Sequence, residues 1–101
     1  MNNIEDILNT NLTSRTKNFK KGDFVQKTLA INSPAIYVKR GLLKSYLIDS
    51  KGTEHIYMFA SEGYIIGDIE AMEYNRPAQL YIDCLEDSQV VLFNKEQLEN
   101  E

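Results

Sequence analysis

Apolar residues recur along the chain in short runs, and each run is separated from the next by turn-forming residues. Aliphatic and aromatic residues dominate these runs, whereas Gly, Asp, Asn, Ser and Pro dominate the breaks. This spacing is typical of an all-β sandwich or barrel. It predicts about eight short strands, at residues 16–19, 24–26, 36–39, 42–48, 54–60, 64–66, 79–84 and 89–93.

The clearest pair of strands is 42–48 with 54–60, which flank a hairpin loop at residues 49–52 that ends on Gly52. Helical spacing occurs at the two ends of the chain. The first pattern predicts a short amphipathic helix over about residues 3–12. The second predicts Asn94 as the N-cap of another helix, whose first residues are 95–101. A single domain over residues 1–101, with a β-roll over about 15–94, follows from this pattern.

A candidate site lies where a predicted strand gives way to a short helix. Gly67 allows a sharp turn after the apolar strand, and Asp68 stands at the N-cap position of a helix over residues 69–74. Pro77 lacks an N–H and restricts the residue before it, so the helix must stop nearby. A strand, a glycine turn and a helix start together predict a cradle for an anion or another ligand.

Composition narrows the classes of function. The 101 residues carry a formal net charge of −4, which argues against a basic surface for nucleic acid. Cys84 is the only cysteine, so no internal disulfide is possible and a reducing compartment fits. No apolar run approaches the ~20 residues of a membrane span, and the N-terminus lacks the features of a signal peptide. We therefore expect a cytoplasmic domain with no membrane partner.

Metal chemistry has little support in the sequence. His55 is the only histidine, and a single histidine without cysteine partners makes no zinc site. We expect no metal ion and no catalytic residues.

Five segments occur in an order that carries a family resemblance. Together they resemble the cyclic-nucleotide-binding domain, in particular the sensor domain of Crp/Fnr-type bacterial transcription regulators. The resemblance covers roughly residues 8–98. The segments are Phe19-Lys20-Lys21-Gly22-Asp23, Tyr37-Val38-Lys39-Arg40-Gly41-Leu42, Asp49-Ser50-Lys51-Gly52-Thr53-Glu54, Gly63-Tyr64-Ile65-Ile66-Gly67-Asp68-Ile69 and Leu85-Glu86-Asp87-Ser88.

The resemblance implies a mainly β fold, a double-stranded β-helix (jelly roll) with short flanking helices and a phosphate-binding cassette at residues 67–80. In full-length relatives a dimerisation helix and a helix-turn-helix DNA-binding domain follow. We therefore expect a sensor module or part of a longer homodimeric regulator, which would contact DNA only through a domain absent from this chain. Its effector would be a cyclic nucleotide or another small molecule.

The cassette departs from the family motif. That motif begins Gly-Glu-(Leu/Ile), whose glutamate binds the ribose, and ends Arg-(Ser/Thr)-Ala, whose arginine pairs with the cyclic phosphate. Gly67, Asp68 and Ile69 match its first part. Counted back from the following strand, Ala78 stands at the arginine position and Gln79 at the hydroxyl position.

Arg76 precedes the arginine position by two residues, and Asp68, Glu70 and Glu73 make the cassette acidic. This departure from the family motif implies that cyclic AMP is not bound in the usual way. The pocket would hold another small molecule or none, and its candidate residues are Gly67, Asp68, Ile69, Arg76, Ala78 and Gln79.

Several alternatives stay open at this point. Asp68 is either a helix cap or a ligand contact, and Arg76 is either a solvated loop residue or a phosphate clamp. Aromatic residues that either stack on a ligand or pack between strands are Tyr57, Phe59, Tyr64 and Tyr81. Other jelly rolls include cupin-like binding proteins and enzymes, for which Glu54 or Asp83 would be nominal bases. Attachment to a channel, kinase or transporter is a third possibility.

Overall fold

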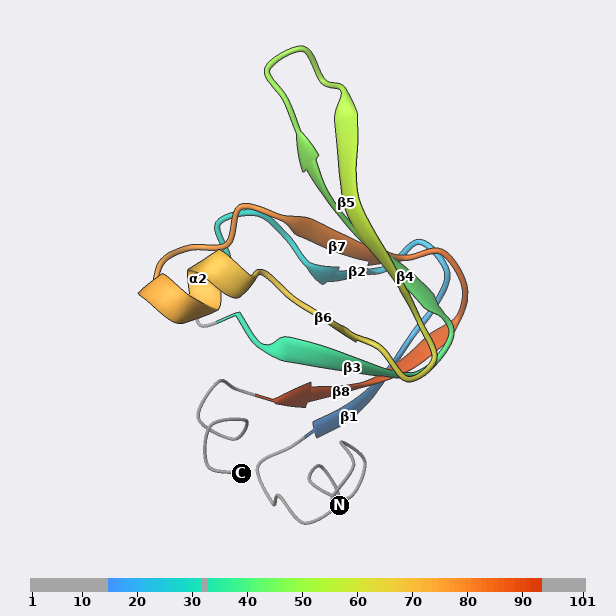
Figure 1. Ribbon diagram of the computed structural model, residues 1–101. Coiled ribbons are helices and arrows are strands. Elements are labelled where there is room, and N and C mark those ends of the chain that lie inside the picture. Colours follow the sequence, from blue (N-terminus) through green and yellow to red (C-terminus); the bar gives the residue numbers. More distant parts are fainter. Residues whose placement is uncertain (1–14, 32, 94–101) are drawn as a thin grey trace.

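The protein is a jelly roll of two four-stranded antiparallel sheets, as a computed structural model shows (Figure 1). The structure describes residues 15–31 and 33–93. One helix, α2 (Ile69–Tyr74), interrupts the run of strands between β6 and β7. The strands are β1 (Arg15–Phe19), β2 (Phe24–Gln26), β3 (Ala35–Arg40), β4 (Leu42–Ile48), β5 (Glu54–Ser61), β6 (Ile65–Ile66), β7 (Tyr81–Cys84) and β8 (Ser88–Phe93).

Strands that are distant in sequence pair side by side. One sheet has the order β1-β8-β3-β6 and the other β2-β7-β4-β5, so only β4 and β5 are consecutive neighbours. The β4–β5 hairpin extends beyond the rest of the roll (Figure 1). The sandwich or barrel predicted from strand spacing is therefore confirmed as a β-roll.

Apolar side chains between the two sheets form the main core. Because side chains alternate across a strand, β3 and β7 each supply every second residue to this core, whereas β5 supplies only Ala60. Burial removes apolar surface from water, which is the dominant favourable contribution to folding. The fully or almost fully buried members are Ile36, Val38, Leu43, Ala60, Ile66, Ile82, Cys84 and Val90.

Strand β3 pairs with β6, the strand that precedes the cassette, and with β8, the last strand of the described residues. Ile36 pairs with Ile66 of β6, and its neighbour Ala35 pairs with Phe93 of β8. The end of β6 and the end of β8 are therefore bonded to the same end of one strand.

A glycine allows two strands to meet closely at the start of β4. Gly41 has a φ of +105°, and a Cβ atom there would lie 2.1 Å from Oγ of Ser88. That Ser88 hydroxyl accepts a hydrogen bond from Leu42 N–H. A side chain at position 41 would thus be strained by its backbone angle and blocked by its neighbour.

The predicted strands and the helix at residues 69–74 are confirmed, with small shifts at their ends. The strand expected over 79–84 begins only at Tyr81, because the N–H groups of Gln79 and Leu80 donate to the Asp68 carboxylate. The helices expected at residues 3–12 and 95–101 lie outside the described residues.

Candidate functional site

The residues after β6 form the cassette, which we define as residues 67–80. Gly67 ends the strand, and Asp68 takes an extended conformation at the N-cap of α2. The helix ends where Asn75 adopts a left-handed conformation with φ of 57°, and Arg76 N–H donates to the carbonyl of Ala71. Such a left-handed cap satisfies carbonyl groups at the helix end before Pro77 prevents its continuation.

Asp68 closes the cassette on itself. Its Oδ1 accepts from Ala71 N–H at 3.1 Å, while Oδ2 accepts from Gln79 N–H at 2.7 Å and Leu80 N–H at 3.1 Å. The residue is 5% exposed. Three backbone donors thus occupy a buried carboxylate, and the start of α2 is tied to the chain that returns toward β7.

Arg76 lies on the outer side of the cassette. The Arg76 guanidinium donates to the carboxylate of Glu70, six residues earlier in the chain. The same guanidinium lies 5.2 Å from the centre of the Tyr74 ring. About half of the Arg76 side chain is exposed. Glu70, one of the two glutamates of the cassette, therefore binds the only arginine of the cassette.

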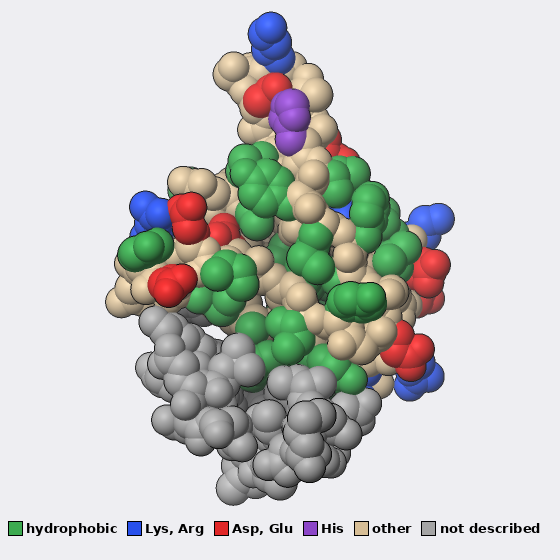
Figure 2. Space-filling view, viewed as in Figure 1, with side chains coloured by type: hydrophobic (Ala, Val, Ile, Leu, Met, Phe, Trp, Pro, Cys, Tyr) green, Lys and Arg blue, Asp and Glu red, His purple; other side chains and the backbone are tan. Residues whose placement is uncertain are grey.

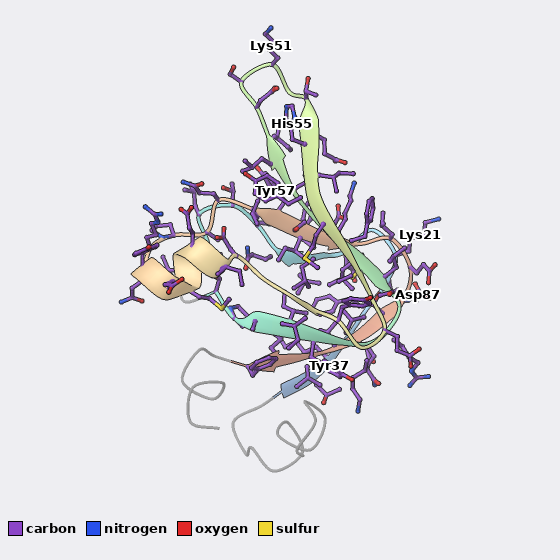
Figure 3. All side chains as sticks on the ribbon, in the orientation of Figure 1. Lys21, Tyr37, Lys51, His55, Tyr57 and Asp87 are labelled. Atoms are coloured by element: carbon purple, nitrogen blue, oxygen red, sulfur yellow. The ribbon has the colours of Figure 1, made fainter. Side chains whose placement is uncertain are left out.

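A pocket of about 340 Å³ separates the cassette from the β4–β5 hairpin. Its volume falls in the range of small-molecule sites. Figure 3 places Tyr57 near the base of this hairpin, with His55 and then Lys51 farther toward its tip. The lining residues are Ser45, Tyr57, Met58, Gly67, Asp68, Ile69, Glu70 and Leu80.

Three of the six candidate residues predicted from the sequence line this pocket: Gly67, Asp68 and Ile69. The other three do not. Arg76 pairs with Glu70, and Ala78 is completely buried with its backbone bonded to Leu29 and Ala30.

Gln79 contributes its N–H to Asp68, and its side chain is exposed. The sequence-based choice between a cap and a ligand contact at Asp68 is answered in part, because the cap is present in the structure.

Sequence reasoning did not select four of the lining residues: Ser45, Met58, Glu70 and Leu80. Ser45 carried a usable signal, since it is a polar residue at an inward position of an apolar strand and is 2% exposed. Met58 reaches the pocket through the β4–β5 pairing, which single-strand patterns do not reveal, whereas Glu70 and Leu80 belong to the cassette itself.

The aromatic residues separate into two groups. Tyr57 lines the pocket, whereas Tyr81 stacks on Tyr46 at 5.4 Å and lies 6.0 Å from the Phe24 ring. Tyr46 Oη donates to Asp83, and burial together with that bond raises the pKa of the Tyr46 phenol. For Tyr81, packing between strands is therefore the role that the structure shows.

The hairpin loop is organised by Asp49. Its carboxylate accepts from the N–H groups of Lys51 and Thr53, each at 2.9 Å, and lies 2.7 Å from Nε2 of His55. The bond from His55, followed by that from Thr53, lowers the pKa of the Asp49 carboxyl. His55 is thus exposed and engaged at the surface. Within residues 15–31 and 33–93, no group of His, Cys, Asp or Glu is arranged to hold a metal ion.

A second hollow, of about 410 Å³, lies at the start of β8 near Asp87 (Figure 3). Its polar side chains bond to one another: Arg40 donates to Gln89 at 3.4 Å, and Gln89 donates to Asn18 at 3.1 Å. These three groups are exposed or partly exposed, and the buried Ser88 hydroxyl in the same lining already accepts from Leu42 N–H and donates to the Glu86 carbonyl.

Comparison with known proteins identifies relatives of the whole β-roll. A family model described as cyclic nucleotide-binding domain matches residues 16–101. None of the curated protein sequences matches the chain closely enough to count as a relative. In the part of the chain that the structure describes, no helix is long and apolar enough to cross a membrane.

Solved structures share the fold at low identity. The sensor domain of the transcriptional regulator DNR from Pseudomonas aeruginosa superposes with a TM-score of 0.77 at 21% identity, over 87% of this chain and 59% of that one. The Thermus thermophilus catabolite activator protein gives 0.74 at 11% identity, over 86% and 40%. The EAL enzyme Bd1971 in its cAMP-bound form gives 0.73 at 20%, over 85% and 23%. The chain thus spans about a quarter to three fifths of these three structures.

Proposed function

Because this chain belongs to the cyclic nucleotide-binding domain family, we propose that it is the ligand-sensing regulatory domain of a Crp/Fnr-like transcription regulator. It acts without catalysis, in the cytoplasm, as part of a homodimer. DNA is contacted by another part of the longer protein. The likeness to the DNR sensor domain and the catabolite activator protein supports this class of regulator through the shared fold.

The observation that carries the proposal is the closed cassette against the hairpin. Asp68 holds the cassette in one shape, and the resulting pocket is lined by Tyr57 and Met58 on one side and by Ile69 on the other. A ligand that binds this pocket better in one cassette position than in another shifts the population toward that position. Such a shift is the minimum that a sensor requires.

Cyclic AMP is not the effector in this proposal. Ala78, at the family's arginine position, is completely buried, and its backbone N–H and carbonyl are already bonded. Arg76 is bound to Glu70 and is absent from the pocket lining. A cyclic phosphate in the pocket would therefore meet the carboxylate of Glu70, while the guanidinium of Arg76 is already paired and lies outside the lining.

A thermal-shift screen of the 101-residue chain tests the sensor function. We expect no shift with micromolar cyclic AMP or cyclic GMP, and a rise of several degrees with an effector from a metabolite panel at ~10 times its Kd. Tyr57→Ala should abolish that rise. Tyr64→Ala is the matched control, because Tyr64 is similarly exposed, at 59% against 64%, but does not line the pocket.

Two outcomes would contradict the proposal. A panel of metabolites without any stabilising member would argue against a ligand sensor. A clear shift with cyclic AMP that Arg76→Ala abolishes would show that the cassette binds the phosphate after all. For the regulator as a whole, a full-length protein that neither dimerises nor retards a promoter fragment in a gel would contradict its proposed role as a transcription regulator.

A further inference from the structure

We propose that the cassette pocket takes an uncharged, largely apolar effector, and that Glu70 excludes anions by occupying Arg76. This inference rests on the proposed sensor function and names the ligand class of the same site. It concerns how charge is distributed around the pocket, and it gives Glu70 a role in specificity.

The pocket lining contains carboxylates and lacks cations. Asp68 and Glu70 are its two ionisable acids, and no lysine, arginine or histidine belongs to the lining among the described residues. A negative charge placed inside would therefore be repelled at short range, where water screens it incompletely.

Asp68 is not available to a ligand. Both of its oxygens accept backbone hydrogen bonds, and the residue is 5% exposed. A ligand amine that replaced these donors would leave the N–H groups of Ala71, Gln79 and Leu80 unpaired, at a cost that the new contact would have to offset. Asp68 thus maintains the pocket rather than selecting its contents.

Glu70 and Arg76 form an ion pair at the rim, and of the two only Glu70 belongs to the pocket lining. The ion pair leaves neither side chain buried, with 66% and 48% of their surfaces exposed. Arg76 also lies over the Tyr74 ring, which directs the guanidinium away from the pocket lining. The carboxylate of Glu70 takes the place beside Arg76 that an anionic ligand would need.

The remaining lining is apolar and open. Tyr57 is 64% exposed and Ile69 is 64% exposed, although both line a pocket, and Met58 and Leu80 add further apolar surface. Figure 2 shows hydrophobic side chains gathered on this face below the hairpin. Ser45 is the one buried neutral polar side chain of the lining, so it suits an uncharged ligand with a single hydrogen-bonding group.

Two fluorescent probes that differ in charge test the inference. N-phenyl-1-naphthylamine is neutral, and 1-anilinonaphthalene-8-sulfonate is nearly the same molecule with an added sulfonate. We expect the wild-type chain to bind the neutral probe at least about tenfold more tightly, which is the size of effect that one close like charge produces. Tyr57→Ala should weaken binding of the neutral probe, which would show that the probe binds in the pocket.

Variants of the ion pair separate its two members. Glu70→Gln should raise affinity for the sulfonate by about tenfold and so reduce the preference for the neutral probe, because one repulsive charge is removed and Arg76 is released. The double variant Glu70→Gln with Arg76→Gln should lose most of that gain. Glu73→Gln is the matched control, since Glu73 lies on the same helix but is neither in the pocket lining nor paired in a described ion pair.

Equal affinity of the wild-type chain for both probes would overturn the inference, as would a probe preference that Glu70→Gln leaves unchanged. Neutral-probe binding that Tyr57→Ala does not affect would place the apolar site elsewhere and overturn it too. These outcomes are independent of the metabolite screen, which can fail or succeed whatever the charge preference of the dyes.

Discussion

At the scale of single residues, Asp68 has the largest structural role in the site. One buried carboxylate accepts bonds from the beginning of α2 and from two residues that follow the cassette loop. The shape of the loop therefore depends on an interaction between positions eleven and twelve residues apart.

Replacement of Asp68 should show this dependence directly. We expect Asp68→Ala to lower the free energy of unfolding by about 2–3 kcal/mol, because it removes a helix cap and leaves the buried N–H of Leu80 unpaired. Urea denaturation measures the loss. Glu73→Ala, on the exposed face of the same helix, should change stability by less than about 0.5 kcal/mol. Equal effects of the two variants would show that the three bonds contribute nothing specific.

The same residue illustrates what the sequence could and could not predict. Local signals sufficed for α2, since Asp68 before it and Asn75-Arg76-Pro77 after it mark both ends. The pairing of Asp68 with Gln79 and Leu80 is not local, so the start of β7 was placed two residues early. Arg76 and Glu70 were noted as opposite charges, but nothing in their spacing showed that they bind each other.

At the scale of elements, the β4–β5 hairpin supplies the wall that faces the cassette. Its strands were predicted correctly from apolar patterning, and Tyr57 was one of the aromatic candidates. The position of Met58 in the pocket lining was not predicted, because a bulge in the β4–β5 pairing shifts the register beside it, between Ser45 and Tyr46. Such a shift reassigns side chains to faces and cannot be read from alternation alone.

The hairpin loop should weaken in acid through Asp49. Its carboxyl has a lowered pKa in the folded chain, so its contribution is complete above the ordinary value of about 4 and is lost as pH falls through the folded value. We expect the hydrogen-exchange protection of Thr53 N–H, corrected for intrinsic rates, to decrease over that acidic range. Asp49→Ala should remove the pH dependence and the protection together.

Ser50→Ala provides the control within the same loop, because no described hydrogen bond of the loop involves the Ser50 side chain. A Thr53 protection profile that is the same in the wild-type chain and in Asp49→Ala would exclude the carboxylate as the organising group.

At the scale of the whole molecule, the two sheets share one core that also encloses Cys84. This thiol is 2% exposed, and burial raises its pKa, so it is held in its unreactive protonated form.

Thiol labelling with a disulfide reagent therefore reports opening of the roll. We expect native Cys84 to react at least about a thousandfold more slowly than the unfolded chain, in line with ordinary domain stabilities. Ile82→Ala, which creates a cavity in the same core, should speed labelling of the folded protein by more than about tenfold. Rapid labelling of the native wild-type chain would mean that β7 opens independently of the rest.

Strand β3 has a further consequence for signalling. The residue before the cassette and the last described residue of the chain are bonded to adjacent β3 positions, Ile36 and Ala35. In the proposed sensor, neighbouring residues of β3 therefore connect the cassette to the end of β8, without the hydrophobic core lying between them. A ligand that displaced Gly67 would need to shift only this one strand to displace Phe93 as well.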